Sequence, residues 1–230
     1  RGSLDRLREP DDGDSAGPQR HDQPLPRSAG VLGEGPILGR GIVRVDRRSA
    51  QDPELVLVGD EPDRRLEEIG RQAFRERLGR AIETLERAAD AGKIAAWGLA
   101  TWNGLRVPPE HPEHLSLASI WKIAGDVAGA GHRFRGVQLP VNLAMAHAVA
   151  FRSQQSPSSE KIRVSALEAA TELGLGTFGS ASLLQGRLAG ELPEEVVLAF
   201  PEAATPARRA LQFSRSAPGL TTALVGVSDV

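Results

Sequence analysis

The sequence predicts an α/β fold with about five parallel strands. Short, mostly apolar runs alternate with stretches of helical periodicity over residues 54–230, and such alternation is typical of parallel strands joined by right-handed helical crossovers. The runs begin near residues 55, 94, 135, 176 and 221, which is a nearly regular repeat. Their apolar character suits strands buried on both faces. This spacing fits either a (β/α) barrel with insertions in its loops or an open doubly wound sheet.

Each predicted element has a local signal. The strands are the short apolar runs Leu55–Val58, Ile94–Ala100, Phe134–Leu139, Gly176–Ala181 and Leu220–Val227. The helices between them are Asp63–Ala91, Ser116–Ala128, Glu160–Leu173 and Thr205–Ser216. The first helix has one apolar face and ends before Gly92, and the second begins at a serine that can cap it. The third ends before Gly174, and the fourth has a proline at its first helical position.

Residues 1–53 differ from the rest of the chain. They are rich in Arg, Asp, Gly and Pro, contain no Phe, Trp, Lys or Asn, and lack a helical period or a long alternation. A segment of this composition buries little apolar surface, so an irregular or disordered segment is expected before a barrel-like region at 54–230. One short strand is predicted inside it, between Gly41 and Asp46. Out-of-frame translation of GC-rich DNA would yield the same composition and is the alternative explanation.

The composition excludes several classes of protein. A formal net charge of −2 over 230 residues leaves no basic excess for a nucleic-acid surface. No apolar run approaches the roughly 20 residues that span a bilayer, and the first ten residues lack the apolar core of a signal peptide. The absence of Cys excludes disulfides and thiolate metal sites. A cytoplasmic protein with no nucleic-acid or membrane partner is expected.

Two short motifs have structural explanations. Residues 174–179 fit Gly-x-Gly-x-x-Gly, but they follow a predicted helix and open a strand, the reverse of a dinucleotide-binding loop. We therefore interpret Gly174 as a helix cap. His111 and His114 lie in a proline-rich turn with no third ligand close in sequence, and zinc sites need three or four protein ligands. No metal site is predicted.

Small polar residues follow the predicted strands at their carboxyl ends, where parallel α/β proteins bind their ligands. Gln138 lies inside one of these strands, and a buried Gln must satisfy both a carbonyl and an NH2 group. It either bonds a neighbouring strand or loop, or it recognises a carboxamide of a ligand. The residue alone favours neither interpretation.

Four segments form an ordered set of motifs. They are the helix-Gly-Lys-Ile-strand stretch 88–101, the Val-Gln-Leu-Pro-Val-Asn-Leu stretch 137–143, the Gly-rich strand and loop 173–188, and the Ala-Leu…Pro-Gly-Leu…Val-Gly stretch 210–226. In this order, the four segments resemble the aldo/keto reductase family. The resemblance covers roughly residues 55–230. It implies a partial (β/α)8 TIM barrel to which this chain contributes strands four to eight.

The resemblance also implies a cofactor, NADP(H) or less often NAD(H), and a small carbonyl substrate. In the family, residues after strand five and a Gln of strand six hold the nicotinamide carboxamide, and the matching residues are Thr101, Trp102 or Asn103, and Gln138. The loops after strands seven and eight approach the cofactor phosphates, and the matching residues are Ser180, Ser182, Leu183, Gln185, Val227 and Ser228.

The family's proton-donating residues have no counterpart in this sequence. Its catalytic Asp, Tyr and Lys lie on strands one to three, which are not recognisable here, and Gly59 or Asp60 stands where its His is expected. The chain contains no Tyr, which removes one common general acid. No catalytic residue is therefore assigned, and a truncated or frameshifted reductase with little activity is expected. The alternative is a non-catalytic binding or scaffold module that retains a partial nucleotide site.

Five strands cannot close an eight-stranded barrel. The first and last strands would then be open edges, which tend to pair with another chain. We expect self-association through these edges, poor solubility, or an edge covered by the N-terminal segment.

Overall fold

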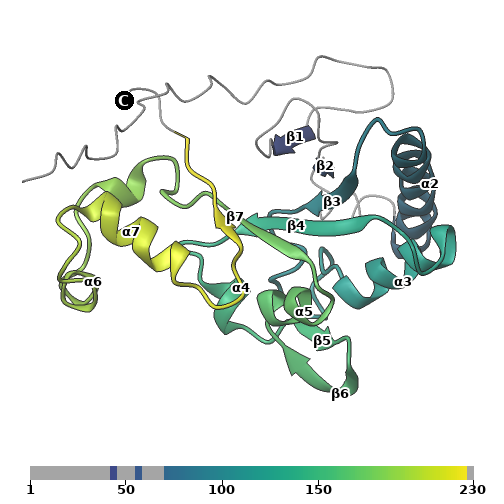
Figure 1. Cartoon of the computed structure of the whole chain (residues 1–230). Helices are drawn as coiled ribbons and strands as arrows, with labels where there is room; N and C mark the ends of the chain where they lie inside the picture. The colour runs from purple at the N-terminus through teal and green to yellow at the C-terminus, as the bar shows by residue number, and fades with distance from the viewer. Residues whose placement is uncertain (1–41, 46–54, 59–69, 227–230) are drawn as a thin grey trace, which may run out of the picture.

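A six-stranded sheet organises the part of the chain that this computed structural model describes, which comprises residues 42–45, 55–58 and 70–226 (Figure 1). Its strands, in spatial order, are β1 (Ile42–Val45), β2 (Leu55–Val58), β3 (Ala96–Ala100), β4 (Phe134–Pro140), β7 (Gly176–Ser180) and β8 (Thr222–Ala223). Strands β2, β3, β4, β7 and β8 are parallel, and β1 is antiparallel to β2. The prediction of an α/β fold with five parallel strands is confirmed.

The parallel strands lie in the sheet in the order in which they occur in the chain. A doubly wound sheet reverses its strand order at a switch point, and the described strands show no such reversal, which does not support the doubly wound interpretation. The larger helices accordingly lie on one side of the sheet in Figure 1. The sheet is open, with β1 and β8 as its two edges. The short strand predicted between Gly41 and Asp46 is present as β1, and it covers the edge of β2.

Side-chain caps fix the start of three of the described helices. The four longest helices in the described part of the chain are α2 (Arg71–Asp90), α3 (Leu117–Ala128), α5 (Ala166–Glu172) and α7 (Pro206–Arg215). The Ser116 hydroxyl accepts the Ser119 N–H, so the predicted N-cap is confirmed. The Thr205 hydroxyl accepts the Arg208 N–H, and Pro206 occupies the first helical position of α7 as predicted. Residues 63–69 of the first predicted helix lie outside the described part of the chain.

Gly174 ends α5, as predicted. Its φ of 67° is in the left-handed region, where an L residue is strained. The Gly174 N–H donates to the Thr171 carbonyl, and the Leu175 N–H donates to the Ala170 carbonyl. These two bonds form a Schellman motif. The Gly-x-Gly-x-x-Gly pattern therefore begins as a helix cap.

The predicted helix Glu160–Leu173 is wrong in its first part. Residues Ser159–Val164 form strand β6, which pairs antiparallel with β5 (Gln154–Ser156). The helix begins only after Ser165, because a capping box fixes its start. The Ser165 hydroxyl accepts the Glu168 N–H at 3.2 Å, and the Glu168 carboxylate accepts the Ser165 N–H at 2.7 Å. The last strand is also shorter than predicted, because β8 spans only Thr222–Ala223.

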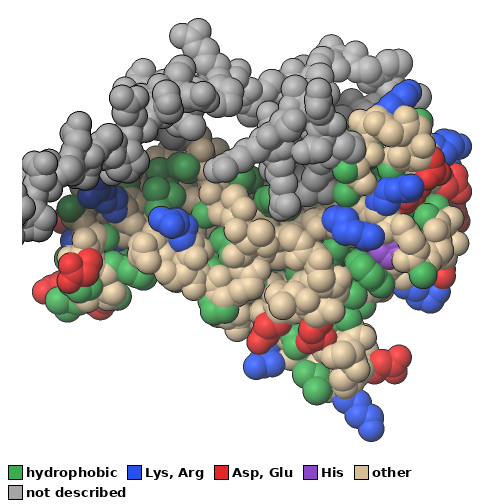
Figure 2. Space-filling view, in the orientation of Figure 1, with side chains coloured by type: hydrophobic (Ala, Val, Ile, Leu, Met, Phe, Trp, Pro, Cys, Tyr) green, Lys and Arg blue, Asp and Glu red, His purple; other side chains and the backbone are tan. Residues whose placement is uncertain are grey.

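Besides strands β5 and β6, three short helices of the described part of the chain were not predicted. They are α4 (His147–Ala150), the 3₁₀ helix η1 (Arg187–Ala189) and α6 (Glu194–Ala199). The surface in Figure 2 carries acidic and basic side chains over several of the helices. Among the described residues, no helix combines the length and apolar character required to cross a membrane.

The main core lies between the sheet and its helices. An irregularity between Trp97 and Gly98 shifts the register of β3 against β4, so that Trp97 pairs with Phe134 while Gly98 pairs with Gly136. The extra residue, Arg135, is exposed. This bulge places Phe134 on the same side of the sheet as Trp97, and the two rings stack with centroids 4.7 Å apart. Both rings are almost completely buried and anchor this core.

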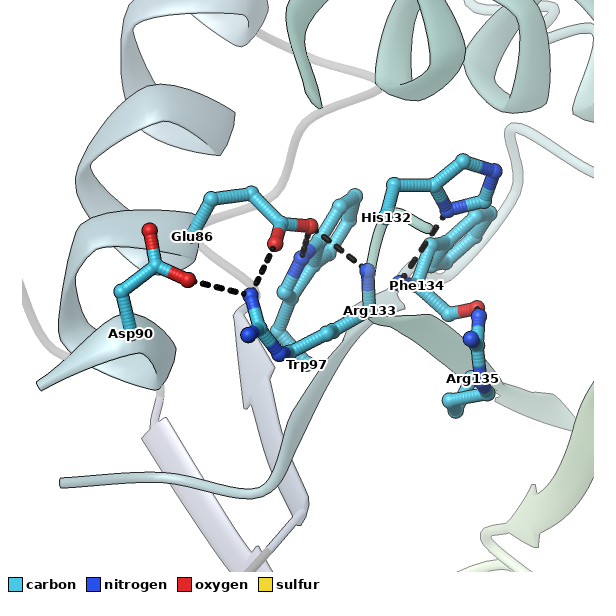
Figure 3. Close-up of polar contacts among 7 residues, drawn as sticks. All are labelled: Glu86, Asp90, Trp97, His132, Arg133, Phe134 and Arg135. Carbon is cyan, nitrogen blue, oxygen red and sulfur yellow. Dashed lines mark hydrogen bonds and ion pairs between the residues drawn. The ribbon is translucent and has the colours of Figure 1, made fainter. Parts of the chain in front are cut away.

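A buried carboxylate holds α2 to the amino-terminal ends of β3 and β4 (Figure 3). Glu86 accepts the Trp97 indole N–H at 2.7 Å and the Arg133 backbone N–H at 2.7 Å. The Arg133 guanidinium reaches both Glu86, at 3.1 Å, and Asp90, at 2.8 Å. Burial alone would raise the pKa of Glu86, but the hydrogen bonds from Arg133 and Trp97 outweigh it and lower this pKa.

Candidate functional site

The predicted site residues gather at the carboxyl ends of three neighbouring strands. Thr101 directly follows β3, Gln138 lies in β4, and Ser180 ends β7. The Thr101 N–H donates to the Gln138 carbonyl at 2.9 Å, and Ser180 pairs with Pro140 of β4. The structure thus brings these segments together at the end of the sheet where the parallel strands terminate, which we call the carboxyl edge. Val227 and Ser228 lie outside the described residues.

Gln138 lies on the side of the sheet opposite the main helices. Its neighbours in the strand, Val137 and Leu139, point into the core, and side chains alternate along a strand. In register, it lies between Ala100 of β3 and Phe178 of β7, neither of which has a side chain that forms hydrogen bonds. The Gln138 Oε1 atom is buried, and within the described part of the chain it has no hydrogen-bond partner.

Three glycines lie in register next to Gln138 on the same side of the sheet. Gly98 pairs with Gly136, and Gly136 pairs with Gly176. They carry no side chains of their own on this side, and Gly98 and Gly136 are buried. The Phe178 ring extends towards the last of them, since a Cβ atom on Gly176 would lie 3.6 Å from that ring.

The loop after β3 uses most of its polar groups internally. The Thr101 hydroxyl accepts the Gly104 N–H at 3.0 Å. Asn103 donates to Glu113 at 2.8 Å and accepts from Arg106 at 2.8 Å, and Arg106 also donates to the Trp102 carbonyl. The Trp102 side chain is 46% exposed. Of the three predicted residues here, Trp102 therefore presents the most accessible surface, whereas Asn103 is engaged with its own loop.

The loop after β7 has an unusual backbone. Three residues that are not glycine have positive φ, namely Ala181 at 54°, Leu184 at 46° and Gln185 at 53°. Such conformations are costly for L residues and occur often at functional sites. Gln185 is exposed and Leu183 is half-buried. Ser182, by contrast, is buried and its hydroxyl donates to the Gly179 carbonyl at 3.4 Å, so this side chain points into the protein.

Asn142 is a residue that the sequence analysis did not assign to the site. It follows β4 and is completely buried. Its Nδ2 donates to the Ala181 carbonyl at 2.9 Å, and its Oδ1 accepts the Ala144 N–H at 3.0 Å. Asn142 therefore joins the loops that follow β4 and β7. Its position at the end of the Val-Gln-Leu-Pro-Val-Asn segment was the only signal in the sequence.

The Gln154 side chain holds the loop after β3 through hydrogen bonds to its backbone. Its NH2 group donates to the carbonyls of Leu105 and Leu115 at 2.9 and 3.1 Å, and its Oε1 accepts the Leu117 N–H at 2.9 Å. The adjacent Ser153 hydroxyl also donates to Leu105. All these partners are backbone groups far away in the chain, so no pattern in the sequence pointed to them.

The histidines in the proline-rich turn stabilise that turn. His111 Nδ1 accepts the Glu113 N–H at 3.2 Å, and His114 Nδ1 lies 3.1 Å from the Val107 carbonyl. Burial lowers the pKa of His114, so the neutral ring is favoured. Across the described ranges, no three His, Cys, Asp or Glu residues form a group suited to a metal ion.

The side chains gathered at the carboxyl edge are hydroxyls, amides and one exposed indole. These groups recognise a ligand by hydrogen bonds and stacking, and hydroxyl and amide groups do not exchange protons readily at neutral pH. Two pockets lie elsewhere. One, of about 480 Å³, lies beside the C-terminal ends of α2 and α3, and the other, of about 610 Å³, lies beside α7.

No protein-family model and no curated protein matches the chain.

Proposed function

We propose that this chain is a partial aldo/keto reductase barrel that binds a nicotinamide cofactor at the carboxyl edge of its parallel strands. The observation that carries the proposal is the buried Gln138 Oε1 atom, which has no hydrogen-bond partner among the described residues. Leaving a buried acceptor unpaired costs about 1–3 kcal/mol. A ligand that donates an N–H to this oxygen would recover that free energy.

A carboxamide is the group that suits this position. Its NH2 donates to an amide oxygen. Nicotinamide carries this group on a flat ring. The side chains paired with Gln138 in the neighbouring strands are not polar. This favours recognition of a ligand carboxamide by Gln138 over a bond to a neighbouring strand.

The winding of the sheet supports the barrel part of the proposal. In a (β/α)8 barrel, each strand lies beside the preceding strand and the helices form one outer layer. Strands β2, β3, β4, β7 and β8 follow that order, with the larger helices on one side. We infer that they correspond to strands four to eight of such a barrel.

The remaining roles follow from the resemblance and the geometry together. Thr101, Trp102 and Asn103 would line the nicotinamide end, with the exposed Trp102 ring as the accessible surface. The exposed loop after β7 would hold the phosphates with Ser180, Leu183, Gln185 and its backbone N–H groups, whereas the buried Ser182 would support the loop. Val227 and Ser228 would contribute by resemblance alone. NADP(H) is the preferred cofactor, and NAD(H) is the second choice.

When bound, the cofactor supplies a hydride for a small carbonyl compound, but reduction also needs a proton donor beside the forming alkoxide. The hydroxyl and amide groups assigned here orient a ligand and do not fill that role. We therefore propose binding with little turnover by this chain alone.

A fluorescence titration with NADPH tests the proposal. Binding is expected to enhance NADPH emission and to quench Trp102. Gln138→Leu should weaken binding about tenfold, which corresponds to about 1.4 kcal/mol. The matched control, Gln72→Leu, changes an exposed Gln at the start of α2 and should leave binding unchanged.

Three outcomes of this titration separate the possible functions. Absence of NADPH and NADH binding by the folded chain would refute the proposed cofactor site. Binding without aldehyde reduction would favour a binding module over an enzyme. Steady turnover of an aldehyde would contradict the expectation of little activity and would require a search for the proton donor.

A further inference from the structure

Helix α6 presents hydrophobic side chains to solvent. Leu198 is 71% exposed and Val197 is 36% exposed. Glu194 is one helical turn before them, so Glu194, Val197 and Leu198 share one face of the helix. In Figure 2, acidic and hydrophobic side chains lie next to each other over α6, at the left end of the molecule. Neighbouring exposed apolar side chains of this kind can contribute to an interaction surface.

A groove of complementary character lies beside the same helix. It has a volume of about 610 Å³ and is bounded by the end of α6, the turn that follows and α7. Its apolar lining consists of Ala199, Phe200, Pro201, Ala203 and Leu211. Arg208 and Arg215 lie seven residues apart on α7, on the same face as Leu211, and one acidic residue, Glu202, also lines the groove.

The charged groups on both surfaces are available for a partner. In the described part of the chain, Glu194, Arg208 and Arg215 take part in no ion pair. All three side chains are exposed. One surface therefore combines an acidic residue with protruding apolar side chains, and the other combines basic residues with an apolar hollow.

We propose that two copies of this chain associate reciprocally, with α6 of each copy seated in the groove beside α7 of the other. Leu198 would enter the apolar hollow, and Glu194 would approach Arg208 or Arg215. Because each copy carries both surfaces, one two-fold axis satisfies both contacts at once and closes the assembly at a dimer. The surfaces are small, and interfaces below about 1,200 Å² are weak or transient, so the dimer depends on protein concentration.

This dimer differs from association through the edges of the sheet. Edge pairing would use the backbone of β8 or β1, whereas the proposed contact uses side chains of α6 and α7. The proposal is also independent of cofactor binding, because none of the proposed cofactor residues lies in the groove.

A charge exchange tests the proposal on the full chain by sedimentation velocity. One variant carries Glu194→Arg and Glu195→Arg, which replace both acidic residues in the first turn of α6, and the other carries Arg208→Glu and Arg215→Glu in the groove. Each variant alone places like charges opposite each other and should dimerise at least tenfold more weakly than the natural chain. Their equimolar mixture restores opposite charges in both contacts and should dimerise as the natural chain does.

Leu198→Gln provides a second test that does not depend on charge. Because Leu198 is exposed, the variant should fold normally, as far-UV circular dichroism would verify, and should dimerise at least tenfold more weakly. Ile162→Gln is the control, since Ile162 is 52% exposed on β6, outside the proposed contact. A natural chain that stays monomeric at its highest soluble concentration would overturn the proposal. Dimerisation that is unchanged in both charge variants and in Leu198→Gln would overturn it as well.

Discussion

The Nδ2 atom of Asn142 lies 2.9 Å from the carbonyl oxygen of Ala181, so a completely buried amide holds a residue whose φ is 54°. Ala181 is the first residue of the loop after β7, and Asn142 stands just beyond the end of β4. The strained conformation of one loop is therefore tied to the neighbouring strand. This contact sets the direction in which the proposed phosphate loop leaves the sheet.

Replacing Asn142 with Ala should destabilise the fold by about 1–3 kcal/mol, because the Ala181 carbonyl and the Ala144 N–H both lose their partner. Hydrogen exchange should increase in residues 181–189 more than in α3. Urea unfolding and exchange measured by mass spectrometry check the two parts. A uniform increase over the whole chain would show that Asn142 supports only global stability.

Replacing Glu86 with Gln should remove a pH-dependent contribution to stability. The native pKa of Glu86 is below the ordinary value of about 4.3, so the unfolded chain takes up the proton first as the pH falls. The stabilisation from Glu86 is therefore fully present above pH 5 and is lost as the pH falls through the native pKa. The variant should be less stable than the natural chain at pH 7, and the difference should shrink at acidic pH. Urea unfolding at several pH values measures this, and a constant difference would contradict it.

His132 should reduce stability at mildly acidic pH. Burial and the nearby Arg135 lower its pKa, although Glu86 opposes them. Below about pH 6.5 the unfolded chain binds the proton while native His132 remains neutral, so the free energy of unfolding falls with pH in this range. His132→Asn, which retains an acceptor for the Phe134 N–H, should flatten the stability profile between pH 7 and pH 5. The same slope in both proteins would exclude His132 as the source.

Two glycines of positive φ should differ in their tolerance of alanine. Gly219 has φ 81°, and a Cβ there would lie 3.0 Å from the Thr171 hydroxyl and 3.3 Å from Leu167. Gly174 has φ 67° with open space around it. Gly174→Ala should therefore cost only the backbone strain of about 1–2 kcal/mol, and Gly219→Ala should cost clearly more. Thermal unfolding of the two variants compares them, and equal losses would mean that Leu167 and Thr171 adjust freely.

Local signals predicted most of the fold. Gly174 ends a helix because only glycine adopts its φ without strain, and Ser116 begins one because its hydroxyl accepts a nearby N–H. The alternation of strand and helix predicted the parallel sheet. The helix predicted at Glu160–Leu173 was wrong in its first part, because the capping box of Ser165 and Glu168 starts the helix only after Ser165.

Long-range contacts could not be predicted. Glu86 and Arg133 are 47 residues apart, and the partners of Gln154 are backbone groups of a loop about 40 residues away. No periodicity encodes such pairs. For the candidate site, the sequence predicted which segments meet at the carboxyl edge, because parallel strands end on the same side. It could not predict that Ser182 points inward or that Asn103 is engaged by Glu113 and Arg106.

The order of the parallel strands also has a consequence for synthesis on the ribosome. Strands β3, β4, β7 and β8 each pair with the parallel strand of the six-stranded sheet that precedes them in the chain. As each strand emerges, its partner has already been made, and no earlier strand must wait for a distant one. The sheet can therefore grow in one direction, a strand and its crossover at a time, while translation continues.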